Sequence, residues 1–310
     1  MSNNHKISII IPTFNRKSML IRCINSILSG NYDNYEIIIS DDHSSDGTDK
    51  IISKYLKNKK IKYLRNKEEK LLSYTINKAI RLCSGEFILI LDDDNVLDKN
   101  CLKYLATSLE NNNVGAVGPI SLYYSKKNII MNAGVKRSIF MRRAIYPYQN
   151  QEWKHQIKKE QTVYDLLNVF MFKAEVIKKV GMWDLLVPFM GEDGDFQARL
   201  KKQGYRIIIN PKAITYHDIK YTTSRYFMRL TKMRMYHVMH SKILHEYRYD
   251  TIIGKITFSI SIPIYLVYYI KKILFQKYTN NKISIISSLI NGTIVGIKDA
   301  LLNKKDIKWL

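Results

Sequence analysis

Three short apolar runs dominate the first hundred positions, and they constrain the fold more than any other feature. Residues 6–11, 35–39 and 86–91 read KISIII, YEIII and EFILIL. Continuous runs of this length, rich in β-branched residues, are typical of strands buried on both faces of a sheet. Helical patterns lie between and beside them, at residues 18–28, 48–56 and 71–82. This alternation predicts βαβ units and an α/β fold with a mostly parallel sheet.

Polar clusters follow these runs directly. PTFNR occupies residues 12–16, Asp41-Asp42 follows the second run, and Asp92-Asp93-Asp94 follows EFILIL. Proline cannot donate a hydrogen bond to the sheet, so we expect the first strand to end at residue 12. Ligand sites in open parallel sheets lie beyond the carboxyl ends of the strands. We therefore expect the three clusters to share one site.

The three adjacent carboxylates at 92–94 are costly unless something compensates their charge. They repel one another by roughly 1 kcal/mol per close pair in water. Oxygen ligands select hard divalent ions, and Mg²⁺ or Mn²⁺ is held by one or two carboxylates plus substrate phosphates. The alternative is a solvated acidic turn that precedes a helix starting near Asp98.

A second acidic cluster, GEDGDF, occupies residues 191–196. Acidic residues at a helix start are expected from the helix dipole alone. Arg199 lies four residues after Asp195, so we expect these two to form a structural ion pair. Asp193 is then left free to take a proton, and the nearby Arg199 would favour its ionised form. His217 follows a further apolar run, where a lone histidine is either a metal ligand or a core residue.

Several classes of protein are not indicated by this sequence. G-x-S-x-G, Walker and G-x-G-x-x-G patterns are absent, which argues against serine hydrolases, P-loop proteins and dinucleotide-binding folds. The three cysteines, Cys23, Cys83 and Cys101, have no metal-ligand spacing and favour a reducing compartment. The N-terminal apolar run is too short for a signal peptide, so secretion is not expected.

The net charge of +23 is unevenly distributed, because about half of it lies after residue 220. Two apolar runs share that region, at residues 251–270 and 283–297. Lys255 and Pro263 leave about fifteen uncharged residues in the first run, short of the roughly 20 that a spanning helix needs. We therefore expect helices that lie on or dip into an anionic membrane surface. Helices buried against the first 220 residues or against a second copy of the chain, and a spanning hairpin, are the alternatives.

Five segments together resemble the successive motifs of inverting family 2 glycosyltransferases, which have the GT-A fold. They are IIIPTFNR, ISDDHSSDGT, FILILDDDN, GEDGDFQARLKKQGYR and the closing His217. The resemblance implies a Rossmann-like catalytic domain at residues 1–220, with flanking helices. Its nucleotide-sugar-binding half would be residues 1–120, and its acceptor half residues 121–220. Residues 221–310 would form a basic, helical, membrane-associating region.

The resemblance also implies roles for individual residues. Asp193 is the expected catalytic base, and Asp94 with His217 is expected to hold Mn²⁺ or Mg²⁺. Trp183 and Glu192 are expected on the acceptor side, although the apolar residues around Trp183 equally fit a core. The donor nucleotide is expected to contact Pro12, Thr13, Phe14, Asn15, Arg16, Asp42, Asp92 and Asp93. Residues 66–77 lack the family's usual glycine and arginine–asparagine pattern.

The predicted function is the metal-dependent, inverting transfer of a sugar from a nucleotide-diphosphate sugar. The acceptor would be a hydroxyl of a lipid-linked or polysaccharide glycan, at the cytoplasmic face of the cell membrane. One alternative, a nucleotidyltransferase, requires a glycine-rich basic loop where the chain offers only Arg16. Another, a basic nucleic-acid- or membrane-binding protein without catalysis, would for nucleic acid require aromatic residues interleaved with lysines. The basic residues accompany apolar runs instead, so we expect no nucleic-acid partner.

Overall fold

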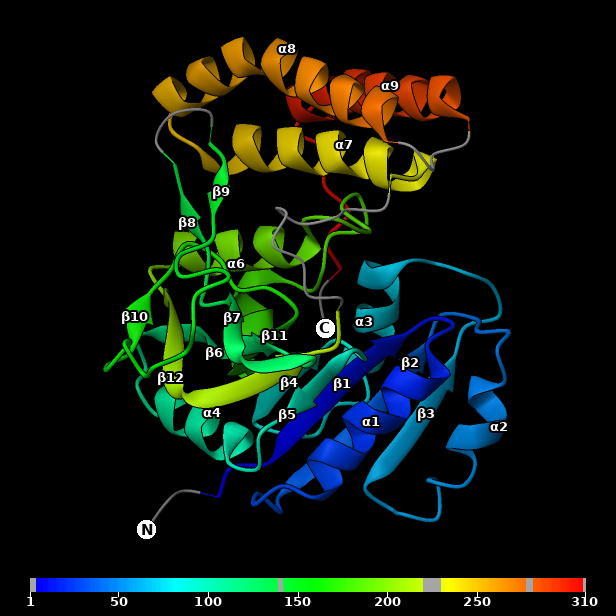
Figure 1. The fold of residues 1–310 in the computed structure, drawn as a ribbon, viewed down its shortest axis with the longest axis vertical. Coiled ribbons are helices and arrows are strands. Elements are labelled where there is room, and N and C mark those ends of the chain that lie inside the picture. The colour runs from blue at the N-terminus through cyan, green and yellow to red at the C-terminus, as the bar shows by residue number, and fades with distance from the viewer. Residues whose placement is uncertain (1–3, 139–141, 220–229, 277–280, 309–310) are drawn as a thin grey trace.

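A mixed, mostly parallel sheet forms the centre of the molecule in a computed structural model (Figure 1), which describes residues 4–138, 142–219, 230–276 and 281–308. The strands are β1 (Ile7–Thr13), β2 (Tyr35–Asp41), β3 (Ile61–Arg65), β4 (Phe87–Leu91), β5 (Asn95–Leu97), β6 (Val114–Tyr123), β7 (Lys126–Asn132), β8 (Lys136–Arg137), β9 (Ala144–Ile145), β10 (Gln161–Thr162), β11 (Val169–Lys173) and β12 (Arg206–His217). The helices are α1 (Lys17–Leu28), α2 (Thr48–Ile52), α3 (Leu72–Ile80), α4 (Cys101–Leu109), α5 (Ile177–Val180), α6 (Glu192–Lys202), α7 (Lys232–Tyr249), α8 (Ile252–Phe275) and α9 (Lys282–Leu301), and a 3₁₀ turn, Ala174–Val176, precedes α5.

The strand order of the main sheet is β10-β12-β6-β11-β4-β1-β2-β3. The strands β3, β2, β1 and β4 are all parallel, which confirms the predicted βαβ units. Antiparallel β11 joins this parallel half to β6 and β12, and β6 and β12 are parallel to each other. β8 and β9 form a separate hairpin that rises from the sheet (Figure 1).

The sheet is buried on both faces, as the apolar runs predict. Ile9 and Ile11 of β1 pack into one core with α1 and α4. Ile10 points to the other face and packs into a second core with α3 and the aromatic side chains of β11. Residues of one strand therefore support both layers of helices, which explains why the strands lack alternating polar positions.

The first strand does not end at Pro12, contrary to the prediction. β1 continues to Thr13, with Pro12 opposite Ser40 of β2. The pairing of β1 with β4 stops earlier, at Ile10. Beyond Ile10, β1 pairs only with β2. Proline lacks a backbone N–H, but no hydrogen bond to β4 is lost at position 12 because β4 does not pair there. Two other elements also differ from the prediction. Helix α2 is shorter than predicted, and the sequence did not predict β5.

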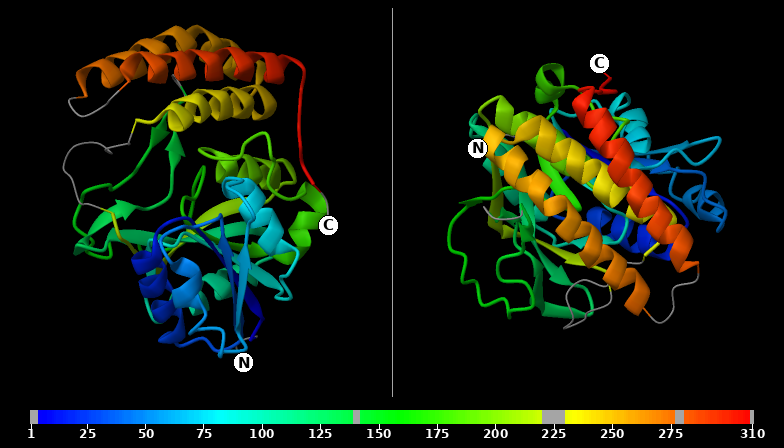
Figure 2. Two further views of the ribbon diagram at one scale, coloured as in Figure 1. Left: turned by 90° about the vertical axis from the view of Figure 1, so that its right-hand side faces the viewer. Right: turned by 90° about the horizontal axis from the view of Figure 1, so that it is seen from above.

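The three C-terminal helices form a separate layer above one end of the sheet (Figure 1). Figure 2 shows α8 and α9 running alongside α7, which lies closest to the rest of the molecule. This helical layer, α7–α9, has its own apolar core, to which Met239 of α7, Phe258 of α8 and Leu289 of α9 contribute. The expected domain boundary near residue 220 falls in 220–229, outside the described residues.

The apolar helices are longer than the sequence suggested. α8 continues through Lys255 and Pro263 for 24 residues, and α9 has 20 residues. By length and composition alone both are sufficient to cross a membrane. The expectation that the apolar run is too short to span is therefore wrong, because neither the lysine nor the proline ends the helix.

Candidate active site

The end of β1 meets the aspartate triad that follows β4, because these strands are parallel neighbours. The Thr13 hydroxyl donates to Asp93 Oδ2 at 2.6 Å. The Arg16 guanidinium donates to Asp93 Oδ1 at 3.1 Å and to Asp94 Oδ2 at 2.8 Å. Thr13 and Arg16 thus supply part of the compensation that three adjacent carboxylates require.

His217 reaches Asp94 through a pairing between strands that are far apart in the chain. β5 follows the triad and pairs antiparallel with the end of β12, with Asn95 opposite His217. His217 Nε2 lies 3.2 Å from Asp94 Oδ1, and both side chains are nearly buried. The other ring nitrogen of His217, Nδ1, is buried without a hydrogen-bond partner among the described residues. The fold therefore brings together the two residues expected to bind a metal.

Burial and mutual repulsion separate the pKa values of the triad. Burial and the charge of Asp94 raise the pKa of Asp92 to about 7. Burial also raises the pKa of Asp93 to about 6, against the charge of Arg16. Burial would raise the pKa of Asp94 as well, but the hydrogen bond and charge of His217 outweigh it and lower that pKa. Negative charge is therefore concentrated on Asp94.

Asp94 and His217 present one carboxylate and one imidazole side by side. That donor set fits Mn²⁺ or Mg²⁺ when oxygens of a bound diphosphate complete the coordination. Within the described ranges, no group of three or more His, Cys, Asp or Glu side chains is arranged to hold a metal. A divalent cation at this position would therefore depend on substrate oxygens for the rest of its ligands.

A first cavity, of about 320 Å³, opens beside the triad. Of the residues expected to contact a donor nucleotide, those that line it are Pro12, Thr13, Phe14, Arg16, Asp42, Asp92 and Asp93. The Phe14 ring is 40% exposed, so it is available for stacking. Asn15 does not line this cavity; its Oδ1 accepts the backbone N–H of Ser45 at 2.7 Å and holds the neighbouring loop.

Asp42 shapes the wall of the first cavity as well as lining it. Its Oδ1 accepts from the Asn66 side chain and the Lys70 backbone N–H, both at 2.8 Å. Its Oδ2 accepts from the Leu71 N–H at 2.8 Å. Leu71 has a φ of 67°, in the left-handed region that leucine rarely adopts. The carboxylate therefore fixes residues 66–71, where the sequence departs from the family pattern.

The opposite wall of the first cavity comes from residues that sequence reasoning missed. Phe189 precedes α6, and Met233 and Arg234 belong to the first turn of α7. The Arg234 guanidinium lies over the Phe189 ring, 5.3 Å from its centroid. No local signal separates Arg234 from the other basic residues after 220, because only the return of α7 over the sheet places it here.

Asp193, at the start of α6, is partly exposed to a second cavity. Gly191 precedes the helix with a φ of 126°, a conformation that requires glycine. Burial raises the pKa of Asp193 well above its usual range, and the charges of Glu192 and Asp92 raise it further. The Trp183 indole opposes this shift by donating from Nε1 to Asp193 Oδ1 at 3.2 Å. A carboxyl group with a raised pKa in a cleft is suited to proton transfer.

Two expectations about the surroundings of Asp193 are wrong. Trp183 does not face an acceptor: its side chain is fully buried and stacks on Phe196 at a centroid distance of 4.2 Å. Arg199 forms the predicted ion pair with Asp195, with Nε and Oδ2 at 3.0 Å. Arg199 also donates to the backbone carbonyls of Val180 and Gly181 and lies over the Phe196 ring, and it is not among the groups that shift the pKa of Asp193. Trp183 provides the hydrogen bond instead.

The second cavity, of about 920 Å³, lies between the sheet, the β8–β9 hairpin and α8. Glu192, Asp193 and His217 line one part of it. Asp92 lines both cavities. A ligand in the first cavity and a ligand in the second can therefore meet at Asp92, with Asp193 close by.

The family model described as Glycosyl transferase family 2 matches residues 8–176. A GalNAc(5)-diNAcBac-PP-undecaprenol beta-1,3-glucosyltransferase of Campylobacter jejuni is 39% identical over 102 residues, which are 32% of this chain and 33% of that protein. A UDP-Glc:alpha-D-GlcNAc-diphosphoundecaprenol beta-1,3-glucosyltransferase of Escherichia coli is 31% identical over 133 residues, 43% of this chain and 50% of that protein. The chain thus spans a third to half of the length of these relatives.

Two solved structures are similar in fold. A mannosyltransferase from Pyrobaculum calidifontis, in complex with GDP-Man and Mn²⁺, has a TM-score of 0.57 at 16% identity, over 94% of this chain and 87% of that chain. The structure of GalNAc-T7 with UDP, GalNAc and Mn²⁺ has a TM-score of 0.61 at 14% identity, over 83% of this chain and 55% of that chain. Both likenesses support the predicted fold class, a GT-A sheet with flanking helices.

Proposed function

The chain belongs to glycosyl transferase family 2, and from that premise we propose that it transfers a sugar, with inversion, from a nucleotide-diphosphate sugar to an acceptor hydroxyl. The donor occupies the first cavity and the acceptor the second. One observation carries this assignment: Asp92 lines both cavities, and Asp193 lies in the second with a raised pKa.

The donor is held by residues that follow the parallel strands and by Arg234 of α7. Phe14 stacks on the base, and Asp42 and the loop it fixes form the adjoining wall. Asp92 and Asp93 face the ribose and the sugar. Arg234 and Arg16 contribute positive charge near the diphosphate, and both line the same cavity.

Asp94 and His217 would hold Mn²⁺ or Mg²⁺ together with the donor diphosphate. A divalent ion bound there supplies positive charge that stabilises the departing nucleoside diphosphate. His217 also fixes the orientation of Asp94, because the two side chains are in direct contact at 3.2 Å. The charge concentrated on Asp94 suits this role.

Asp193 removes the proton from the acceptor hydroxyl as its oxygen attacks the anomeric carbon. The bond from that carbon to the diphosphate oxygen breaks on the opposite face, so a single displacement inverts the configuration. Asp193 must be ionised before it can accept the proton. The Trp183 hydrogen bond stabilises the ionised form against the effect of burial.

We also propose that the helical layer holds this chemistry at a membrane. The outer face of α8 is apolar: Ile253 is 74% exposed, Ile260 71%, and Ile264 and Val267 52% each. No acidic residue occurs in α8. We propose that this face lies in the cytoplasmic leaflet, where flanking lysines meet anionic lipid. The free state of all three cysteines fits a reducing compartment.

Contacts at both ends of the layer favour helices that lie along the membrane rather than across it. Arg142 pairs with Asp250 just before α8, with Nε and Oδ2 at 2.8 Å. His240 Nε2 of α7 lies 3.1 Å from Asp299 Oδ2 of α9. After α9 the Asp306 carbonyl accepts the Leu185 N–H at 3.0 Å. A spanning hairpin would have to break the packing of α8 and α9 on α7.

A panel of nucleotide sugars with Mn²⁺ tests the proposed function, with donor hydrolysis and thermal shift as readouts. Wild type should hydrolyse at least one donor slowly. Asp193→Asn should bind that donor with nearly unchanged affinity, while transfer falls by about a hundredfold or more. Asp49→Asn is the matched control, because Asp49 is a partly exposed residue of α2 that lines neither cavity. Full transfer activity in Asp193→Asn would remove the assignment of the base.

A further inference from the structure

The second cavity extends well beyond Asp193, toward the helical layer. Ala144, Ile145 and Tyr146, in and after β9, line it on one side, and Tyr268, Tyr269 and Lys272 of α8 line it on another. Its volume of about 920 Å³ is near the upper end for ligand pockets and exceeds that of the first cavity. Such a cavity can hold much more of an acceptor than the attacking hydroxyl.

Two cations line this cavity without a carboxylate partner. Arg143 and Lys272 form no ion pair within the described parts of the chain. The acidic residues of α7 and of the turn into α8 are Glu246 and Asp250. Arg137 pairs with both of them, and Arg142 pairs with Asp250.

Glu246 and Asp250 are therefore already paired with other cations. Arg143 lies next to β9 on the hairpin side of the cavity, close enough to Tyr265 and Tyr269 of α8 for its charge to oppose the rise that burial gives to their pKa values. Lys272 comes from the same helix. Two uncompensated cations on facing elements make a site for a ligand that carries more than one negative charge.

The cavity is also continuous with the apolar outer face of α8. Tyr268 lines the cavity and is 50% exposed, next to Val267 and Ile264 of the outer face. On the hairpin side, Ile145 lines the cavity and is 48% exposed. A chain of hydrocarbon can therefore run from the cavity along Ile145 and Tyr268 onto the surface assigned to the membrane.

We propose that the acceptor is an isoprenoid lipid linked to its sugar through a diphosphate, and that Arg143 and Lys272 bind this diphosphate. The sugar reaches toward Asp193, and the isoprenoid leaves between β9 and α8. This inference rests on the proposed function and deepens it, because it selects a diphosphate lipid over a polysaccharide acceptor.

Binding of farnesyl diphosphate to the full chain in detergent tests the proposal without any glycosyl transfer. Wild type should bind this probe more tightly than farnesol, which lacks the diphosphate. Arg143→Ala with Lys272→Ala should weaken binding by about tenfold for each lost charged contact. Inorganic pyrophosphate, which has no hydrocarbon, should bind more weakly than farnesyl diphosphate but should lose affinity on the same two substitutions, because they remove the cations that bind the diphosphate.

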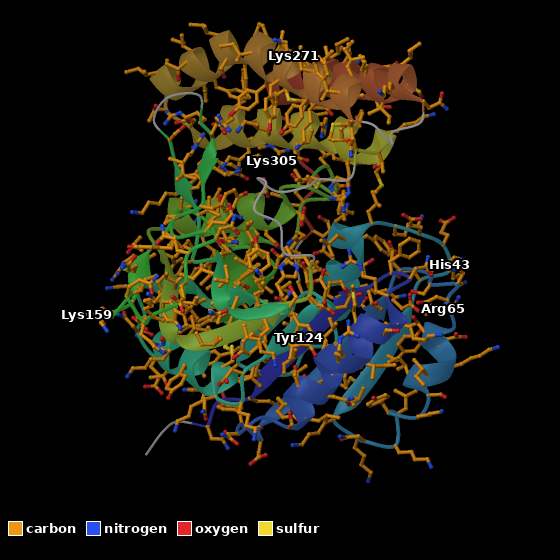
Figure 3. The ribbon with its side chains drawn as sticks, in the orientation of Figure 1. His43, Arg65, Tyr124, Lys159, Lys271 and Lys305 are labelled. Carbon is orange, nitrogen blue, oxygen red and sulfur yellow. The ribbon has the colours of Figure 1, made fainter. Side chains whose placement is uncertain are left out.

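Lys271→Ala is the matched control. Lys271 is the neighbouring residue of α8, is exposed, and lies on the outer side of the layer (Figure 3). It should leave the affinity within about twofold, since it does not line the cavity. Lys272→Glu alone gives a second variant at the site and should weaken binding further than Lys272→Ala.

Donor hydrolysis on the same preparations separates this proposal from the proposed function. If wild type hydrolyses a nucleotide sugar but the double variant binds farnesyl diphosphate as tightly as wild type, the acceptor assignment is overturned and the function stands. Equal affinity for farnesol and farnesyl diphosphate would also overturn it. Failure to hydrolyse any nucleotide sugar counts against the proposed function itself.

Discussion

The Trp183 indole donates a hydrogen bond to the Asp193 carboxylate at 3.2 Å, from a side chain that is itself fully buried. Trp183 is held in one position by its stack on Phe196 and by Asn77, whose side chain bonds both its backbone N–H and its carbonyl. Among the described residues the Asp193 carboxylate thus has one fixed donor, and it lines the second cavity. Four predictions follow from this and from related contacts.

Trp183→Phe should shift the acid limb of the activity profile to higher pH. The pKa of Asp193 is already raised, so activity of the wild type falls as the pH drops through that raised value. The Trp183 hydrogen bond lowers the pKa, and its removal should raise it by about one unit. The pH dependence of kcat/KM measures this shift, with Trp153→Phe as the control. An unmoved acid limb would contradict the assignment of Asp193.

Asp94→Ala should weaken Mn²⁺-dependent nucleotide binding by about tenfold or more, because it removes the carboxylate on which negative charge is concentrated. His217→Ala should have a smaller effect in the same direction. Isothermal titration with and without Mn²⁺ measures both. Asp98→Ala, a nearby carboxylate beyond β5, is the control. Equal Mn²⁺ dependence in all three variants would show that these side chains hold no metal.

Arg248→Met should lower the stability of the whole chain. Arg248 of α7 is almost fully buried and pairs with Asp184 at 2.8 Å and with Asp195 at 3.2 Å. Its loss leaves the buried Asp184 carboxylate without a cation, while Asp195 keeps Arg199, and this costs about 3 kcal/mol. A fall in Tm of roughly 6–10 °C is expected by differential scanning fluorimetry. Arg206→Met, on exposed β12 surface, should change Tm little; equal shifts in the two variants would argue against the buried pairing.

Replacing Ile253, Ile260 and Val267 together by serine should abolish flotation with vesicles of phosphatidylglycerol and phosphatidylethanolamine. Burying each of these side chains in lipid contributes on the order of 1.5 kcal/mol, or about tenfold in partitioning. Leu28→Ser with Leu56→Ser removes exposed apolar groups that lie outside the helical layer and should not change flotation. If the triple variant instead dissociates a dimer, a second copy of the chain covers this face.

Local patterns were sufficient to predict the parallel half of the sheet. The apolar runs at β1, β2 and β4 are continuous because both faces of the sheet are buried. Such a run can be recognised in the sequence without knowledge of any long-range contact. The pairing of Asp195 with Arg199 was predictable for the same reason, since one helical turn sets their distance.

The partners of Asp193 were not predictable in that way. Arg199 is six residues from Asp193 in the chain, yet it points to Asp195 and to backbone carbonyls. Trp183 could be read either as core or as acceptor surface, and the stack on Phe196 decided in favour of core. The outcome for Arg199 depends on how α6 packs against the end of α5, and the outcome for Trp183 depends on how Phe196 of α6 packs against β11. No short window of residues encodes either packing.

The sequence by itself determined which residues form buried strands, that acidic clusters follow them, and that the last ninety or so residues combine basic charge with apolar surface. The tertiary structure alone decided that β5 pairs with β12, which puts His217 on Asp94, and that α7 returns to place Arg234 in the first cavity. The reason is physical: helix and strand periodicity act between neighbours in the chain, whereas contacts between residues more than a hundred positions apart arise only when the whole core packs.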